Sequence, residues 1–296
     1  MFSFTKNKVW FLLLPIIIIA IGVVFYFVNG GFNMDIDFVG GVKMTVATEG
    51  KADMTNEAVK DAVKAATGID ATVQSVSTNQ MMIKTVPITD EQKDAVFAAV
   101  KEKFSLTEEQ PLSTSTASPN FGIEMQQKAL LFALIAALLM LVYISIRFEW
   151  RSGVMAVVTL LMNVLVMVSV YVTFQVPINT TFVAAILTII GYSINDTIVI
   201  FDRIRENVRM SKKESYNTIV DRSIAQSITR SINTSITTLI TIVLLYILGV
   251  PSVKDFAFPL IIGVIIGTYT SIFVASPLWA AWKETERLSQ KQKKSR

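Results

Sequence analysis

Residues 9–28 read VWFLLLPIIIIAIGVVFYFV, a run of 20 residues that contains no charge. A helix needs about 20 apolar residues to cross the roughly 30 Å of hydrocarbon in a bilayer. A cleavable signal peptide has a shorter apolar core of about 7–15 residues and ends in small residues at a cleavage site. This run is longer and ends in Phe-Tyr-Phe-Val, so it predicts an uncleaved membrane-spanning helix.

Five further apolar segments predict that the chain crosses the membrane six times in all. Apolar residues make up 52% of the 296 residues, which favours a multi-span membrane protein over a soluble protein of this length. The fold class predicted is an α-helical integral membrane protein with six transmembrane helices and one small α+β domain. The five further segments are residues 129–146, 153–174, 178–201, 231–250 and 256–282.

The distribution of charge predicts the orientation of the chain. Residues 29–125 hold 14 acidic residues and eight Lys but no Arg, whereas the rest of the chain holds 19 basic and nine acidic residues. Basic residues in short segments between spans mark the cytoplasmic side. We therefore expect both termini in the cytoplasm and residues 29–125 outside it. Cations spread over such segments are not a nucleic-acid footprint, and no nucleic acid is expected as a partner.

The outside segment 29–125 is long enough to form a domain. A helix start at Thr55, a stop at Gly68 and a capping box at Thr89–Gln92 delimit two helices. The order βαββαβ predicts a ferredoxin-like α+β domain. The predicted elements are a strand over 35–48 interrupted at Gly40-Gly41, a helix over 55–67, strands over 71–78 and 80–86 joined at Thr78-Asn79, a helix to 104 and a strand over 112–117.

Four parts are expected: an N-terminal tip with the first span (1–28), the outside domain (29–125), a five-span bundle (126–282) and a basic tail (283–296). Within the bundle, the cytoplasmic connection 203–230 is amphipathic, because apolar residues recur every four positions from Tyr216 to Ile228. This pattern predicts a helix along the inner membrane surface. A solvated helix packed on the other spans would give the same pattern.

Asp196 is the most informative residue, since it lies inside the fourth predicted span. Asp202 follows six residues later, about 9 Å along a helix, at the expected inner boundary. An intramembrane carboxyl is costly unless it is paired, hydrated or protonated, and it is therefore a candidate functional group. The alternative is a helix-end carboxylate that reaches the interface, although the Asp side chain is short.

Arg230 is the candidate partner, because it stands at a similar inner depth at the start of the fifth span. Its alternative role is that of an ordinary positive anchor. Polar residues that follow Arg230 at helical spacing predict a face turned toward other helices or a hydrated crevice, although a lone Thr more often bonds to its own helix. The candidate supporting residues are Tyr192, Ser193, Asn195, Asn233, Thr234 and Thr237.

Small residues four apart on the last span predict close helix packing, with no direct chemistry. The candidate helix-packing residues on that span are Gly263, Gly267 and Ser271, and Gly191 on the fourth span is a further candidate.

The sequence contains no Cys and no His, so neither a thiolate metal site nor a histidine proton carrier is available. No phosphate-binding loop, nucleophile elbow or zinc motif is visible either. We therefore expect no enzyme activity, no metal and no cofactor.

Three segments resemble the signatures of the SecD/SecF family, and in particular its SecF members. They are DIDFVGG at residues 35–41, GYSINDTIVIFDRIREN at 191–207 and RSINTS at 230–235. The order of one span, a small outside domain and five more spans is also that of the family, so the resemblance covers essentially the whole chain. Besides Asp196 and Arg230, the residues within these segments that we match to the family signatures are Asp37, Gly40, Gly41, Asp202 and Arg203.

This resemblance implies that the chain forms half of a transporter of the resistance-nodulation-division type. It also implies that the chain lies in the bacterial cytoplasmic membrane, in contact with membrane lipids. It implies SecD as the other half, the Sec channel SecYEG as a partner, YajC and YidC as further candidates, and translocating polypeptides as the cargo. It also implies that protons are the coupling ion and that Asp196 and Arg230 serve in proton passage. A half-transporter is expected to leave Asp196 and the polar face of the fifth span poorly buried until the partner binds.

Two other functions compete with this one. A stand-alone proton-coupled exporter of small molecules would need larger outside domains than the roughly 95 residues available. A non-transporting assembly scaffold of the translocon would not need Asp196.

The predicted topology can be tested by cysteine labelling, which is clean because the chain has no native Cys. A Cys introduced at Asn79 should react with a membrane-impermeant maleimide from the outside of intact cells. Labelling of that Cys only from the cytoplasmic side would contradict the orientation.

Overall fold

The structure, a computed structural model, describes residues 3–77, 79–211 and 214–294. The chain forms two compact units. A helical unit comprises Met1–Phe32, Leu131–Val176 and Thr181–Arg296, and an α+β unit comprises Asn33–Leu130 and Pro177–Thr180.

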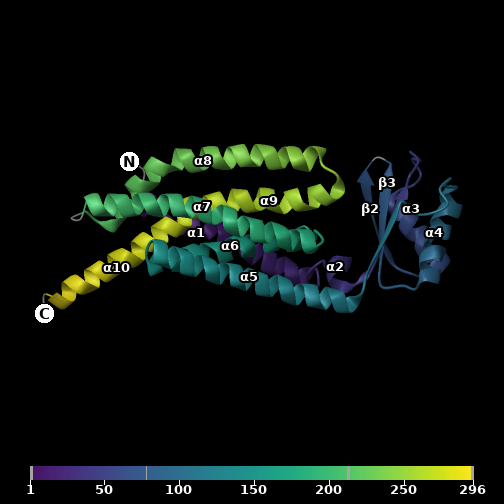
Figure 1. The fold of residues 1–296 in the computed structure, drawn as a ribbon, viewed down its shortest axis with the longest axis horizontal. Helices are drawn as coiled ribbons and strands as arrows, with labels where there is room; N and C mark the ends of the chain where they lie inside the picture. Colours follow the sequence, from purple (N-terminus) through teal and green to yellow (C-terminus); the bar gives the residue numbers. More distant parts are fainter. Residues whose placement is uncertain (1–2, 78, 212–213, 295–296) are drawn as a thin grey trace. The chain divides into compact units, whose positions relative to one another are not determined.

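Across these described ranges, six helical segments are long and apolar enough to cross a membrane, as the apolar runs predict. The last of them continues through a π-helical turn, η1, into a further helix (Figure 1). The segments are α1 (Lys8–Val28), α5 (Pro119–Arg147), α6 (Trp150–Thr173), α7 (Thr180–Met210), α8 (Tyr216–Leu248) and the run of α9 (Pro251–Thr270), η1 (Ser271–Ala275) and α10 (Ser276–Lys294).

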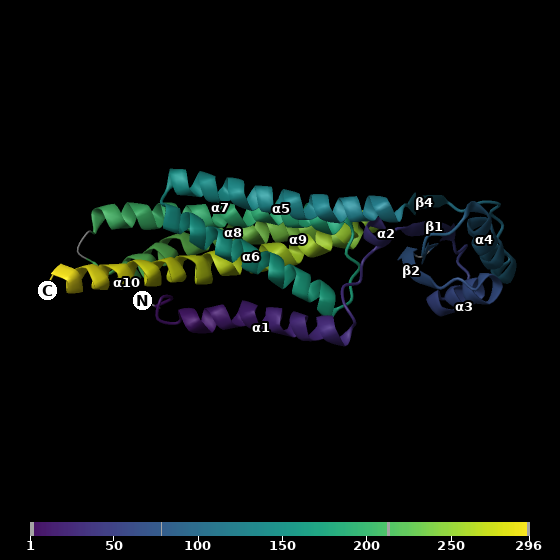
Figure 2. The ribbon, with the colours of Figure 1, turned by 90° about the horizontal axis from the view of Figure 1, so that it is seen from below.

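Within the helical unit, α8 lies beside α9, and α1 lies on another side of the unit against α6 (Figure 2). The contact between α1 and α6 depends on Gly22, where a Cβ would lie 2.3 Å from the Cβ of Ser169. The side-chain amide of Asn29 also donates to the carbonyl of Val172 (3.1 Å). A small residue and a polar bond therefore fix a helix whose other side chains are mostly exposed.

The connection 203–230 does not form a separate helix lying apart from the spans. Its residues continue α7 to Met210 and form the first turns of α8. Val220 and Ile224 are fully buried against Ile200, Ile204 and other apolar residues of α7, η1 and α10. Their periodic pattern therefore reflects packing on the protein's own helices. Residues 212–213 of this connection, and residues 295–296 of the tail, lie outside the described residues.

In the described part of the α+β unit, four antiparallel strands form a sheet in the order β2-β3-β1-β4. Helices α3 and α4 lie on the same side of this sheet (Figure 1), so the element order βαββαβ is as predicted. The elements are β1 (Gly41–Ala47), α3 (Asn56–Thr67), β2 (Ala71–Ser77), β3 (Gln80–Thr85), α4 (Asp90–Phe104) and β4 (Ser113–Ala117).

The two helices of this unit begin where the capping residues predict. The hydroxyl of Thr55 accepts a hydrogen bond from Ala58 N (3.2 Å), and Gly68 ends α3 in the left-handed conformation. Thr89 and Gln92 form the reciprocal capping box of α4. Between the helices and the sheet, Val59, Val63 and other apolar residues are completely buried; burial of such a side chain contributes about 1.5–3 kcal/mol. The turn residue Thr78 lies outside the described residues.

The prediction of a strand from residue 35 was wrong for its first five positions. Ile36–Val39 form a single helical turn, α2, because the Asp35 carboxylate accepts a hydrogen bond from Ile36 N (2.9 Å). Gly40 and Gly41 then redirect the chain with φ angles of +79° and +146°. A Cβ on Gly41 would lie 2.3 Å from the carbonyl oxygen of Thr85, so β1 pairs with β3 only because this residue is a glycine.

Candidate functional site

Asp196 lies at a junction of three helices. Its side chain comes from α7 and the residue is 3% exposed. The Oδ2 atom lies 3.4 Å from the hydroxyl of Ser235 on α8 and 3.4 Å from the hydroxyl of Thr268 on α9, and these two hydroxyl oxygens are 2.6 Å apart. The expectation that this chain alone would leave Asp196 poorly buried was therefore wrong, because its own helices enclose the carboxyl.

A second group of buried polar side chains lies next to this carboxyl on α7. The amide of Asn163, on α6, donates to the hydroxyl of Ser193 (2.9 Å) and accepts from that of Thr270 (2.7 Å). The hydroxyl of Ser271 lies 2.8 Å from that of Thr197 and donates to the carbonyl of Ser193 (3.1 Å). Since unpaired polar groups are costly in an apolar interior, these bonds hold α6, α7 and the π-helical turn in one register.

Small residues make this close approach possible. A Cβ on Gly263 would lie 2.4 Å from the side chain of Ile189, and one on Gly267 would lie 3.1 Å from the Cβ of Ser193. Ser271 continues the series against Thr197. Three residues four apart on the last span thus meet three residues four apart on α7. Ser271 adds a hydrogen bond where packing alone was expected, and it begins the π-helical turn, a feature that is frequent at functional sites.

Gly191 does not take part in this packing within the chain. The glycine is exposed, and a Cβ placed on it would meet no atom within 4 Å among the residues that the structure describes. It lies on the opposite side of α7 from the residues that contact Gly263 and Gly267.

The structure does not bring Arg230 into contact with Asp196. Arg230 is exposed, and among the described residues it forms no ion pair with the carboxyl. Ser231 and Ser235 are the buried residues of this part of α8. Since successive residues of a helix point about 100° apart, the exposed Arg230 and the buried Ser231 lie on different faces of α8.

The candidate supporting residues divide between two faces. Ser193 belongs to the buried network, and Tyr192 is half-buried with a hydroxyl that has no partner among the described side chains. Asn195, Asn233 and Thr237 are exposed. The hydroxyls of Thr234 and Thr237 donate to the carbonyls of Arg230 and Asn233 on their own helix. This is the common arrangement for a Thr in a membrane helix, which we gave as the alternative to a functional role.

The outward face of α7 is also small and polar. Ala184, Thr188, Gly191 and Asn195 are exposed at alternating spacings of four and three residues. Lipid-facing helices expose large apolar side chains, whereas small residues at this spacing allow another helix to approach closely. We call these four residues, together with Arg230, Asn233, Thr237 and Thr241 on α8, the outward polar face.

The family-signature residues lie in both units. In the α+β unit, Asp37 accepts hydrogen bonds from the backbone N–H (3.1 Å) and the hydroxyl (2.8 Å) of Thr180. In the helical unit, Arg203 bonds to Gln226 (2.7 Å) and pairs with Glu206, while Asp202 is exposed. Gly40 and Gly41 have the backbone role described above. None of these contacts reaches the carboxyl of Asp196.

Sequence reasoning missed the second buried carboxylate of the helical unit, Asp221. It accepts hydrogen bonds from the backbone N–H of Thr5 (2.9 Å), the hydroxyl of Thr5 (3.1 Å) and the hydroxyl of Ser3 (2.7 Å). We call this contact the N-terminal clasp. Asn163 and Thr268 were missed as well, although a lone amide and a hydroxyl inside apolar spans were visible signals.

Comparisons with known proteins show which family the chain belongs to. The family model described as "Protein export membrane protein SecD/SecF, C-terminal" matches residues 96–285. Protein translocase subunit SecF of Alicyclobacillus acidocaldarius is 36% identical over 95% of this chain and 93% of its own length. Protein translocase subunit SecDF of Bacillus subtilis is 34% identical over 96% of this chain, which spans 38% of that longer protein. The crystal structure of SecDF from Thermus thermophilus superimposes with a TM-score of 0.82 at 31% identity, covering 95% of this chain and 38% of that one.

Six apolar helices, three of which enclose a buried carboxyl, with a small α+β unit that follows the first helix in the sequence, define a multi-pass membrane protein of the transport class. The chain belongs to the SecD/SecF family and corresponds to its SecF members.

Gly263, which packs against Ile189, and Gly191, which has open space beside it, provide a matched test of the packing. Gly263→Val should lower the apparent melting temperature of the purified chain, because overpacking a well-packed interior costs typically about 1–3 kcal/mol. Gly191→Val should leave that temperature nearly unchanged, because its Cβ would meet open space. Equal effects of the two substitutions on thermal unfolding in detergent would contradict the assigned contact between α7 and α9.

Proposed function

We propose that this chain is an accessory subunit of the bacterial Sec protein translocase, which pairs with SecD and uses the proton gradient to assist polypeptide export. The proposal rests on the family and on relatives named as SecF and SecDF translocase subunits. The fusion of both parts in one SecDF chain supports SecD as the partner. In this proposal the chain spans the cytoplasmic membrane with both termini in the cytoplasm and the α+β unit outside.

The observation that carries the proposal is a buried carboxyl whose hydrogen-bonding neighbours are hydroxyls and which forms no ion pair among the described residues. A hydroxyl donates a hydrogen bond to a carboxylate and accepts one from a carboxylic acid. Ser235 and Thr268 can therefore satisfy Asp196 in both protonation states without a change of partner. Such a site can take up and release a proton at low reorganisation cost, which is what a proton-coupled step requires.

Arg230 supplies the switch in this proposal. A nearby cation favours the ionised form of a carboxyl, whereas burial favours the protonated form. Arg230 precedes Ser231 directly, so a rotation or shift of α8 would exchange hydroxyl neighbours for a guanidinium. The exposed position of Arg230 corresponds to the proton-holding state, and its approach to Asp196 would drive release.

The outward polar face is the proposed contact with SecD. Exposed Asn, Thr and Arg side chains on a membrane-spanning helix are costly against lipid and favourable against another polar or small-residue helix. Both α7 and α8 carry such residues, and α7 also carries Asp196 on its inner face. Binding of SecD would therefore be sensed by the same helix that holds the carboxyl.

Asp196→Asn tests the proton step, because it keeps size and polarity but cannot ionise. We expect it to reduce gradient-stimulated export and proton flux in vesicles that contain this chain and SecD to the levels measured without a gradient. Arg230→Lys should be milder than Arg230→Met, since Lys keeps the charge and loses only the planar fork.

Asp255→Asn is the matched control, since it makes the same chemical change at an exposed position of α9 and should leave the stimulation unchanged. Full stimulation by the gradient in Asp196→Asn vesicles would instead favour an assembly scaffold.

Thr237→Trp tests the contact with SecD, because a bulky side chain on the outward polar face should block helix approach. We expect at least about a tenfold loss of SecD in co-purification, the loss that roughly 1.4 kcal/mol would produce. Leu161→Trp is the control, at an exposed apolar position of α6. Undiminished co-purification of SecD with the Thr237 variant would place the interface elsewhere.

A further inference from the structure

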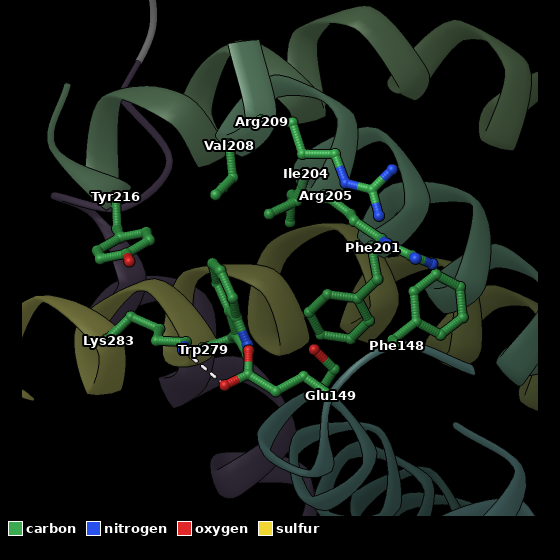
Figure 3. A pocket seen from close by; sticks show the side chains of 11 residues that line it. Phe148, Glu149, Phe201, Ile204, Arg205, Val208, Arg209, Tyr216, Trp279 and Lys283 are labelled. Carbon is green, nitrogen blue, oxygen red and sulfur yellow. Dashed lines mark hydrogen bonds and ion pairs between the residues drawn. The ribbon is translucent and has the colours of Figure 1, made fainter. Parts of the chain in front are cut away.

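A pocket lies at the end of the helical unit where α5 meets α6 and where α7 is followed by α8. Its volume is about 220 Å³, below the roughly 300–1,000 Å³ typical of pockets that enclose a whole small-molecule ligand. The pocket therefore suits a headgroup-sized moiety. Its lining combines aromatic and aliphatic side chains with Arg205, Arg209 and Lys283 (Figure 3).

The charges around the pocket leave an excess of cation. Among the described residues, Glu149 is the one carboxylate in the lining, and it pairs with two cations, Lys283 (2.6 Å) and Arg151 (3.0 Å). Throughout the described ranges, neither Arg205 nor Arg209 forms an ion pair with a carboxylate. They stand four residues apart on α7, and so on the same face of that helix. Two guanidinium groups on one face, neither held by an ion pair within the described residues, favour an oxyanion such as a phosphate.

The wall of the pocket contains an unused hydrogen-bond donor. Trp279 is 5% exposed, and its indole N–H is buried without a partner among the described residues. Its ring packs edge-on against Phe201 and Tyr216, with centroids 6.2 and 5.8 Å apart, and Lys283 Nζ lies 5.8 Å from its centroid. A ligand oxygen inside the pocket would give this N–H a partner, so the wall is both apolar and able to donate.

The position of the pocket points to a membrane lipid. Trp150 and Trp282 form an edge-to-face pair with centroids 5.2 Å apart, and Tyr216 and Trp279 line the pocket itself. Trp and Tyr gather at the level of the lipid headgroups, so this end of the helices belongs at that depth. Basic pockets between membrane helices on the cytoplasmic side are suited to acidic headgroups.

We propose that this pocket binds the phosphate-containing headgroup of an acidic phospholipid. Arg205 and Arg209 bind the phosphate, and the N–H of Trp279 binds a headgroup or glycerol oxygen. Phe148, Ile204 and Val208 contact the apolar part that follows. Because the pocket includes residues of α7 and α10, the lipid ties the end of the helix that carries Asp196 to the first turns of α10.

The test uses the purified full-length chain in non-ionic detergent, with ligand retention followed by native mass spectrometry. The probes are dihexanoyl phosphatidylglycerol, dihexanoyl phosphatidylcholine as the net-neutral lipid, and inorganic phosphate. Phosphatidylglycerol should bind at least about tenfold more tightly than phosphatidylcholine, because the choline cation would be repelled by the cationic lining. It should exceed inorganic phosphate by a similar factor, because phosphate lacks the apolar part that the pocket wall contacts. The double substitution Arg205→Gln and Arg209→Gln should remove the preference over phosphatidylcholine.

The matched control is Lys6→Gln with Lys8→Gln, which removes two charges from the start of α1, outside the pocket. Its affinity for phosphatidylglycerol should stay unchanged. Because Arg205 also donates to the carbonyl of Arg147 (3.1 Å), Arg209→Gln alone serves as the second variant, with its melting temperature measured in parallel. A folded Arg209→Gln chain with undiminished preference would overturn the proposal. Equal binding of phosphatidylcholine would do so too, as would displacement of the acidic lipid by phosphate at equal concentration, which would indicate a site for small anions.

Discussion

The structure depends on one constraint: a carboxyl buried among membrane-spanning helices is costly unless it has hydrogen-bond partners, and here the protein supplies them. Asp196 obtains them from two different helices, through the hydroxyls of Ser235 and Thr268. This requires α7, α8 and α9 to meet at one level. The glycines on the last span allow that approach, and the Asn163 network holds the neighbouring turn of α7 in register. The helices are therefore arranged around a polar requirement, since apolar burial alone would not select this register.

One helix serves two purposes in this arrangement. The buried face of α7 carries Ser193, Asp196 and Thr197, while its exposed face carries small and polar residues that suit another helix. In the proposed complex, a shift of α7 caused by SecD on its exposed face would change the surroundings of Asp196 on its buried face. A family in which related chains occur both as separate subunits and as one fused protein is consistent with a contact of this kind.

The parts of the structure that were predictable from the sequence are those that local patterns determine. The six spans follow from apolar runs, the βαββαβ order follows from caps and periodicity, and Asp196 stood out as a charge inside such a run. The helical turn at Ile36 was not predictable, because it depends on how Gly40, Gly41 and distant Lys84 accommodate Asp35, which pairs with Lys84 at 2.9 Å.

The sequence also could not predict whether Arg230 or Ser235 would be the neighbour of Asp196. Both lie on α8 within two turns, and only the rotation of that helix decides which one faces α7. The same holds for the connection before α8, whose amphipathic pattern fits a membrane surface as well as a protein surface. Its buried face at Val220 and Ile224 is settled by contacts with residues far along the chain.

The N-terminal clasp has a consequence for how the chain is made. The backbone N–H of Thr5 and the carboxylate of Asp221 are separated by 216 positions in the sequence. At about 5–20 residues per second, a ribosome needs on the order of 10–40 s to make the intervening chain. During that interval the segment before the first helix has no carboxylate to bind, although the helix itself is already long enough to enter the membrane. The fixing of the first helix to the start of α8 is therefore a late event of synthesis, which follows the emergence of four spans and the whole α+β unit.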